Sequence, residues 1–182
     1  AQAAMSAAAK ELGLWIVAGT QPIAVPGDPR PANACMVYDD RGRRAARYDK
    51  IHLFDVDLPG GREGYRESAN AVPGDRPVLV DTPAGRLGLT VCYDLRFPEL
   101  FRKLVSEGAE IFSVPSAFTS PTGRAHWETL VRARAIENLA YVLAPAQGGY
   151  HVNGRETHGD SMIVDPWGVV LDCYKTGAGF VS

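Results

Sequence analysis

The sequence contains few cysteines, little net charge and no long apolar run. Its three cysteines, Cys35, Cys92 and Cys173, lie far apart without a Cys-x-x-Cys pair, which argues against a disulfide framework and a zinc site. A net charge of −2 provides no basic field for nucleic acid or an anionic membrane. No apolar run approaches the length of a spanning helix, and the first residues lack the features of a signal peptide. We therefore expect a cytoplasmic protein that binds neither nucleic acid nor membrane.

The length and composition of the chain are those of a globular domain. Of the 182 residues, 46% are hydrophobic and 22% are charged, which is ordinary for a chain with a sizeable core. There are no internal repeats, low-complexity tracts or charge runs, so we expect a single domain over residues 1–182. Hairpin signals alternate with strand–helix–strand units, a pattern typical of a layered α/β fold.

The local pattern predicts most elements of that fold. Helices are expected over residues 3–12, ended by Gly13, over 98–108 and over about 125–139. Strands are expected over residues 14–18, 34–38, 44–48, 78–81, 87–91, 110–114, 140–144, 161–164 and 169–174. Two segments are expected to be loops: residues 21–33, which contain Pro22, Pro26, Pro29 and Pro31, and the long stretch 51–77.

Cys92 occupies the junction between the strand at 87–91 and the helix that begins at Pro98. A sharp strand-to-helix turn lifts one side chain out of the packed sheet and frees neighbouring backbone N–H groups to meet an oxyanion. This position suggests a nucleophilic cysteine. On spacing alone, a buried cysteine that acts as a small hydrophobic residue is the more common case.

Two longer motifs resemble a known family. Residues 47–57 (RYDKIHLFDVD) and 91–100 (VCYDLRFPEL) are similar to the lysine and cysteine motifs of the nitrilase superfamily, the carbon–nitrogen hydrolases. Within it the Nit branch fits best, because further Nit-like motifs follow in the same order at residues 115–118, 126–128, 132–138 and 164–168. Several independent motifs in register make the resemblance specific, and it covers nearly the whole chain.

The resemblance implies a four-layer α-β-β-α sandwich and a Glu-Lys-Cys catalytic set. On that pattern Cys92 attacks an amide carbonyl, and Lys50 together with the backbone N–H of Tyr93 stabilises the oxyanion. Glu67 matches a second glutamate of the family, which positions substrate and lysine. Arg96, Phe118 and His126 are candidates for the substrate site. The alternatives are a buried pair of Arg96 with Asp94, a core position for Phe118 and a structural role for His126. No metal or organic cofactor is implied.

One part of the family pattern has no match in these residues. The general-base glutamate of the family lies upstream of the lysine, whereas the sole glutamate before Lys50 is Glu11, at the end of a predicted helix. We therefore expect the domain to be incomplete at both ends, with the base outside these 182 residues. Glu67 is a weaker candidate for that role.

The resemblance also suggests a substrate class and a partner. Details of the motifs favour an amidase of the deaminated-glutathione type, which acts on a small amide that carries a carboxylate. An ω-amidase, an N-carbamoyl amidohydrolase and a nitrilase are alternatives in the same family, and a binding or scaffold module without the base is an alternative of another class. Family members pair through the helix after the nucleophile and its neighbour, so a homodimer or higher homo-oligomer is expected.

Overall fold

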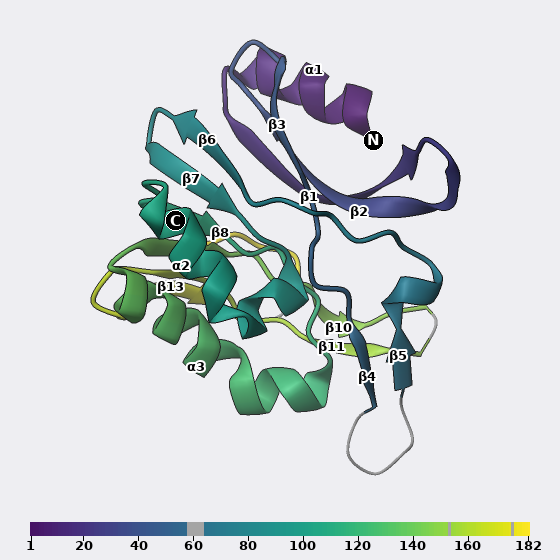
Figure 1. Ribbon diagram of the computed structural model, residues 1–182. Helices are drawn as coiled ribbons and strands as arrows, with labels where there is room; N and C mark the ends of the chain where they lie inside the picture. Colours follow the sequence, from purple (N-terminus) through teal and green to yellow (C-terminus); the bar gives the residue numbers. More distant parts are fainter. Residues whose placement is uncertain (58–63, 153, 176) are drawn as a thin grey trace. The chain divides into compact units, whose positions relative to one another are not determined.

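The computed structural model of the protein describes residues 1–57, 64–152, 154–175 and 177–182. Its backbone divides into two compact units, Ala1–Val78 and Leu79–Ser182, which are described in turn and can be followed by colour in Figure 1. Among the described residues there is no helix long and apolar enough to cross a membrane. The expectation of a single domain stays a prediction.

The first unit is built on a three-stranded antiparallel sheet and one helix. The sheet order is β1 (Ile16–Val25), β2 (Asp28–Tyr38) and β3 (Arg44–Asp49). The alanine-rich α1 (Gln2–Leu12) ends at Gly13, which adopts the left-handed conformation (φ 63°) and whose N–H donates to the carbonyl of Ala9. Ala9 packs with Ala34, Met36 and Tyr38 of β2 in a buried cluster, so α1 covers one face of the sheet.

The proline-rich segment 21–33 is paired strand rather than loop, and this prediction was wrong. β1 continues to Val25 and β2 begins at Asp28, with Pro22 opposite Asn33 across the pair. The prolines are tolerated because β1 is an edge strand, and because β3 pairs with β2 only from Ala34 onward. A missing N–H costs little where no neighbouring strand needs it.

Short elements interrupt the long segment that the sequence predicts as loop. β4 (Asp55–Asp57) pairs antiparallel with β5 (Gly64–Arg66), and the 3₁₀ turn η1 (Glu67–Ala69) follows. Part of the predicted loop therefore forms two short paired strands. Residues 58–63 of that predicted loop lie outside the described residues.

The second unit contains a six-stranded mixed sheet, in the order β13 (Val170–Tyr174), β12 (Ser161–Val164), β9 (Tyr141–Ala144), β8 (Ile111–Ser113), β7 (Gly85–Leu89) and β6 (Val78–Thr82). β7, β8 and β9 run parallel, whereas β12 is antiparallel to both of its neighbours. A separate two-stranded ribbon joins β10 (Gly148–Tyr150) to β11 (Glu156–His158).

Helices α2 (Pro98–Ser106) and α3 (Ser120–Asn138) cover one face of this sheet (Figure 1). Phe101 of α2 meets Phe112 of β8 edge-on, with ring centroids 4.9 Å apart, and both are fully buried. α3 begins five residues before the predicted start, because Thr119 caps it with its hydroxyl and Pro121 suits its first turn. The strands at 78–81, 87–91, 110–114, 140–144, 161–164 and 169–174 are confirmed within two residues at each end.

Candidate active site

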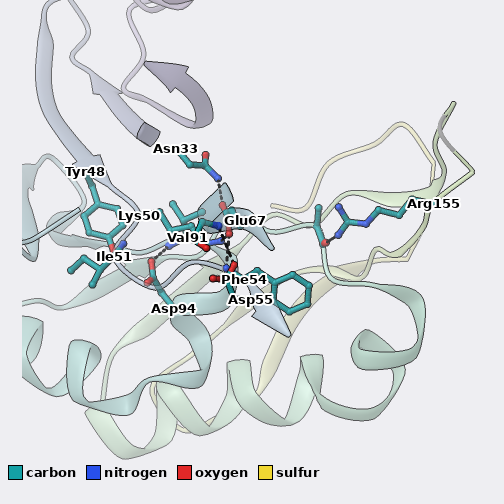
Figure 2. A network of polar contacts seen from close by, with 12 residues as sticks. Asn33, Tyr48, Lys50, Ile51, Phe54, Asp55, Glu67, Val91, Asp94 and Arg155 are labelled. Atoms are coloured by element: carbon teal, nitrogen blue, oxygen red, sulfur yellow. Dashed lines mark hydrogen bonds and ion pairs between the residues drawn. The ribbon is translucent and has the colours of Figure 1, made fainter. Parts of the chain in front are cut away.

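Lys50 follows the last residue of β3 and is buried, with 3% of its side chain exposed. Figure 2 shows that its Nζ contacts Glu67 Oε2. The two atoms are 2.5 Å apart. Lysine is almost never buried unless its ammonium is paired, and here the partner is the glutamate that the family resemblance singled out. The structure therefore brings together two of the predicted catalytic residues within the first unit.

The carboxylate of Glu67 is held by three donors. Oε2 also accepts from the backbone N–H of Phe54 at 2.7 Å, and Oε1 accepts from Asn33 Nδ2 at 3.0 Å (Figure 2). Burial by itself raises the pKa of the Glu67 carboxyl, but the Lys50 charge and the three hydrogen bonds outweigh burial and hold the pKa below its ordinary value. A carboxylate stabilised in this way is a poor proton acceptor and a good anchor for an ammonium.

Cys92 stands at a strained turn in the second unit. β7 ends at Leu89, and the 3₁₀ turn η2 (Cys92–Arg96) begins with Cys92 in the left-handed conformation, at φ 51°. A non-glycine residue rarely adopts this backbone conformation, which costs about 1–3 kcal/mol. Residues in such strained conformations occur mainly at functional sites. The Cys92 N–H donates to the carbonyl of Pro115 at 3.0 Å, and the residue is half-buried rather than sealed in the core. The predicted elbow is therefore present.

A buried carboxylate fixes the backbone on both sides of Cys92. Asp94 is fully buried, and its Oδ2 accepts from the backbone N–H of Val91 at 2.8 Å (Figure 2). In return the Asp94 N–H donates to the carbonyl of Val91 at 3.1 Å. These two bonds span the cysteine and hold the turn in one shape.

Arg134 of α3 supports the same turn from the helix side. Its Nε and Nη2 donate to the carbonyl of Leu95 at 3.0 and 2.8 Å, and its Nη1 bonds Glu137 Oε1 at 2.6 Å. The guanidinium carbon lies 5.3 Å from the centroid of the Phe101 ring. The bonds from Arg134 to Leu95 cannot be predicted from the sequence, because spacing along one helix says nothing about another element.

The four predicted oxyanion and substrate residues also lie together in the second unit. The Arg96 guanidinium lies 6.0 Å from the centroid of the Tyr93 ring and 5.5 Å from that of Phe118. Arg96 Nη2 is 3.2 Å from His126 Nδ1. Phe118 packs against Trp127, with ring centroids 5.0 Å apart, and is 6% exposed. The group joins one cation to two aromatic rings and an imidazole, a set suited to an anionic organic ligand.

Sequence reasoning missed two residues that hold the site together. Asn33 lies in a segment predicted as loop, so its amide was not predicted to be part of the site, and no role in the site was predicted for Arg134. Within the part of the chain that the structure describes, no group of three or more histidine, cysteine, aspartate or glutamate residues could hold a metal ion.

Comparison with known proteins agrees with these features. Residues 2–178 match the carbon–nitrogen hydrolase family. The chain is 51% identical over 164 residues to the deaminated glutathione amidase of Yersinia enterocolitica, covering 90% of this chain and 57% of that protein. It is 45% identical to the deaminated glutathione amidase of Bos taurus, covering 94% of this chain and 53% of that protein. The chain thus spans between half and two-thirds of the length of these curated relatives.

Solved structures show the same fold. The NitFhit protein of C. elegans aligns with a TM-score of 0.89 and 44% identity, covering 95% of this chain and 42% of that one. An amidase from Nesterenkonia, solved with acrylamide added to its active-site cysteine, aligns with a TM-score of 0.83 and 27% identity over 99% of this chain and 66% of that one.

These likenesses confirm the predicted α/β class and the nitrilase-type sandwich fold. The match to the family extends over nearly every residue from the first helix to the last strand. The chain belongs to the carbon–nitrogen hydrolase family of the nitrilase superfamily.

Proposed function

We propose that the protein is an amidase that hydrolyses a small, carboxylate-bearing linear amide of the deaminated-glutathione type, with Cys92 as its nucleophile. The observation that carries the proposal is the half-buried Cys92 at φ 51°, held at a strand-to-helix elbow by bonds on both sides. A merely structural cysteine gains nothing from so costly a backbone state. The names of the relatives supply the substrate class.

The proposed reaction proceeds through a thioester. The Cys92 thiol gives up its proton and its Sγ attacks the carbonyl carbon, the C–N bond breaks, and the departing nitrogen takes up that proton as it leaves as ammonia or an amine. Water then attacks the thioester, releasing the carboxylic acid and restoring the thiol. Lys50 and the Tyr93 backbone N–H stabilise the oxyanion in both tetrahedral intermediates, where one preorganised donor contributes on the order of 3 kcal/mol. Glu67 keeps the ammonium of Lys50 in place.

The Arg96 group supports the choice of an anionic substrate. Arg96 is half-buried and its guanidinium lies close to the Tyr93 and Phe118 rings. These contacts restrict the positions that the charged group can adopt. A guanidinium can bind a carboxylate through two parallel hydrogen bonds. We assign Arg96 to the carboxylate of the substrate, with Phe118 and His126 beside it.

The test is a comparison of substrates with the natural full-length protein. Deaminated glutathione, an ω-amide, an N-carbamoyl amino acid and an aliphatic nitrile are offered in turn, and kcat/KM is measured for each. The proposal predicts the highest value for deaminated glutathione and a loss of roughly a thousandfold or more in Cys92→Ala. Cys173→Ala, which removes an exposed cysteine, serves as the matched control and retains full activity.

Two outcomes contradict the proposal. A faster reaction with the nitrile or the carbamoyl compound would assign the protein to another branch of the family. Acylation of Cys92 without turnover in the full-length protein would favour the binding module instead.

We further propose that the protein forms a homodimer through α2 and α3 and acts in the cytoplasm. The outer side of α3 exposes Ile136 (49%) and Leu139 (75%), and the turn after β12 adds Trp167 (82%). That turn is fastened to α3, because Arg132 Nε donates to the carbonyl of Gly168 at 2.8 Å. A groove of about 380 Å³ between α2 and α3, lined by Pro98, Glu99, Arg102 and Glu137, adjoins this side. Clustered apolar side chains of this kind mark contact surfaces.

A further inference from the structure

Asn33, on β2, is bonded to both members of the Lys50–Glu67 pair. Its backbone carbonyl accepts a hydrogen bond from the Lys50 backbone N–H at 2.9 Å, and its Nδ2 donates to Glu67 Oε1 at 3.0 Å. The contact between Lys50 Nζ and Glu67 Oε2 closes a ring of three residues (Figure 2). All three belong to the unit Ala1–Val78, so the ring is complete within one unit.

The Asn33 amide holds the second oxygen of the Glu67 carboxylate. The last torsion of a glutamate is broad, so the carboxylate turns readily unless both oxygens are held. Lys50 Nζ and the Phe54 N–H both meet Oε2, whereas the Asn33 amide holds Oε1. Because the ammonium is bonded to this carboxylate, the plane of the carboxylate determines where Nζ points.

We propose that Asn33 is a positioning residue, which directs the Lys50 ammonium toward the oxyanion of the substrate by fixing the Glu67 carboxylate. This inference rests on the proposed amidase function, since it concerns the oxyanion donor of that reaction. An oxyanion donor acts mainly in the transition state. Its misdirection therefore lowers kcat while KM stays nearly constant.

Two substitutions separate positioning from simple stability. Asn33→Ala removes the amide, and Asn33→Asp keeps its shape but replaces the donor with a second carboxylate facing Glu67. Both variants are expected to lose about ten- to a hundredfold in kcat, with KM unchanged within about twofold, for the hydrolysis of deaminated glutathione by the full-length protein.

The matched control is Ser6→Ala. It removes another side-chain hydrogen bond of the same unit, the 2.6 Å bond from Ser6 Oγ to the carbonyl of Gly42. Ser6 joins α1 to the turn between β2 and β3, away from the Lys50–Glu67 contact in the hydrogen-bond network. This variant is expected to melt at a lower temperature and to keep the wild-type kcat.

A second readout needs no substrate. The titration of Glu67 is followed by the NMR shift of its carboxyl carbon. Because the Asn33 hydrogen bond is among the interactions that lower the Glu67 pKa, the midpoint moves to higher pH in both Asn33 variants, most in Asn33→Asp. The acid limb of the kcat profile moves in the same direction. In Ser6→Ala neither changes.

The outcomes distinguish this inference from the proposed function. If the unaltered protein hydrolyses amides and both Asn33 variants match Ser6→Ala in kcat and in the Glu67 midpoint, the positioning role is overturned and the amidase function stands. The other outcome is that the unaltered protein hydrolyses no amide, although the midpoint of the Glu67 titration depends on Asn33. The amidase function is then overturned, whereas the interaction of Asn33 with the Glu67 carboxylate stands.

Discussion

At the scale of single residues, the buried Lys50–Glu67 pair links stability to the proposed chemistry. The ammonium is 3% exposed and the glutamate side chain 21% exposed, so water screens this contact far less than a surface ion pair. The two charges compensate each other's loss of hydration, and the remaining lone pairs of the carboxylate are used by Asn33 and Phe54. Removal of either charge leaves the other buried without its partner.

Glu67→Gln is therefore expected to lower the free energy of unfolding by about 2–3 kcal/mol at pH 7. The folded-state pKa of Glu67 is lowered, so its stabilising contribution is present above the ordinary glutamate pKa and is lost as the pH falls through the lowered value. Urea unfolding of both proteins should show the difference shrinking once the pH drops below about 4.

Asp57→Asn is the matched control for this measurement. It breaks the ion pair with Arg66 in the same unit, whose two side chains are 55% and 75% exposed. Water screens a pair this exposed, so it contributes little to stability. An equal loss of stability in Asp57→Asn, or a Glu67→Gln difference that is the same at about pH 7 and pH 3, would contradict the assignment.

At the scale of elements, prediction from the sequence succeeded for helices and strands that depend on a local pattern. It failed where pairing with a neighbouring strand determines the structure of a segment. The helix over 3–12, the strands over 34–38 and 44–48 and the elbow at Cys92 depend on propensity, turn residues and periodicity within a few positions, and all are confirmed. The prolines of 21–33 suggest a loop because proline cannot donate to a strand on either side. Sheet order, which one sequence does not reveal, places them where no donor is needed.

The same distinction explains which site residues were found. Cys92, Lys50 and Glu67 came from motifs that resemble a family, whereas Asn33 and Arg134 act through partners 34 and 39 positions away. Contacts over such separations depend on how strands and helices are placed side by side. No periodicity along the chain carries that information.

The apolar surface of α3 and the turn after β12 leads to a prediction about assembly. If the proposed dimer forms through this surface, Ile136→Asp or Leu139→Asp should give a monomer in sedimentation velocity of the full-length protein, because a carboxylate in an apolar contact loses its hydration. Tyr150→Asp, which alters another exposed apolar residue, on β10, should leave the proposed dimer intact. Dissociation by Tyr150→Asp alone would place the interface elsewhere.

At the scale of the whole molecule, two units each hold part of the proposed chemistry. The first unit carries the Lys50–Glu67 pair with Asn33, and the second carries Cys92 with the Arg96 group. Each part is held by contacts within its own unit. The amidase mechanism requires that the thiol of one and the ammonium of the other act on the same carbonyl, and this requirement is the central claim of the proposal.

The three cysteines differ enough for a chemical test of that claim. Burial raises the pKa of the Cys35 thiol to about 12, so this residue does not react at neutral pH. Cys173 is exposed and is replaced by serine to remove background labelling. In this protein an activated ester of a carboxylate-bearing acid can then report on Cys92.

The most direct measurement is the fate of the acyl group when the full-length Cys173→Ser protein meets a p-nitrophenyl ester. The proposed mechanism predicts a burst of about one equivalent of p-nitrophenol and an acyl group on the Cys92 peptide after an acid quench. It also predicts that Lys50→Met slows the burst by roughly a hundredfold or more. An acyl group on another residue, an undiminished burst in Cys92→Ala, or a wild-type rate in Lys50→Met would contradict it.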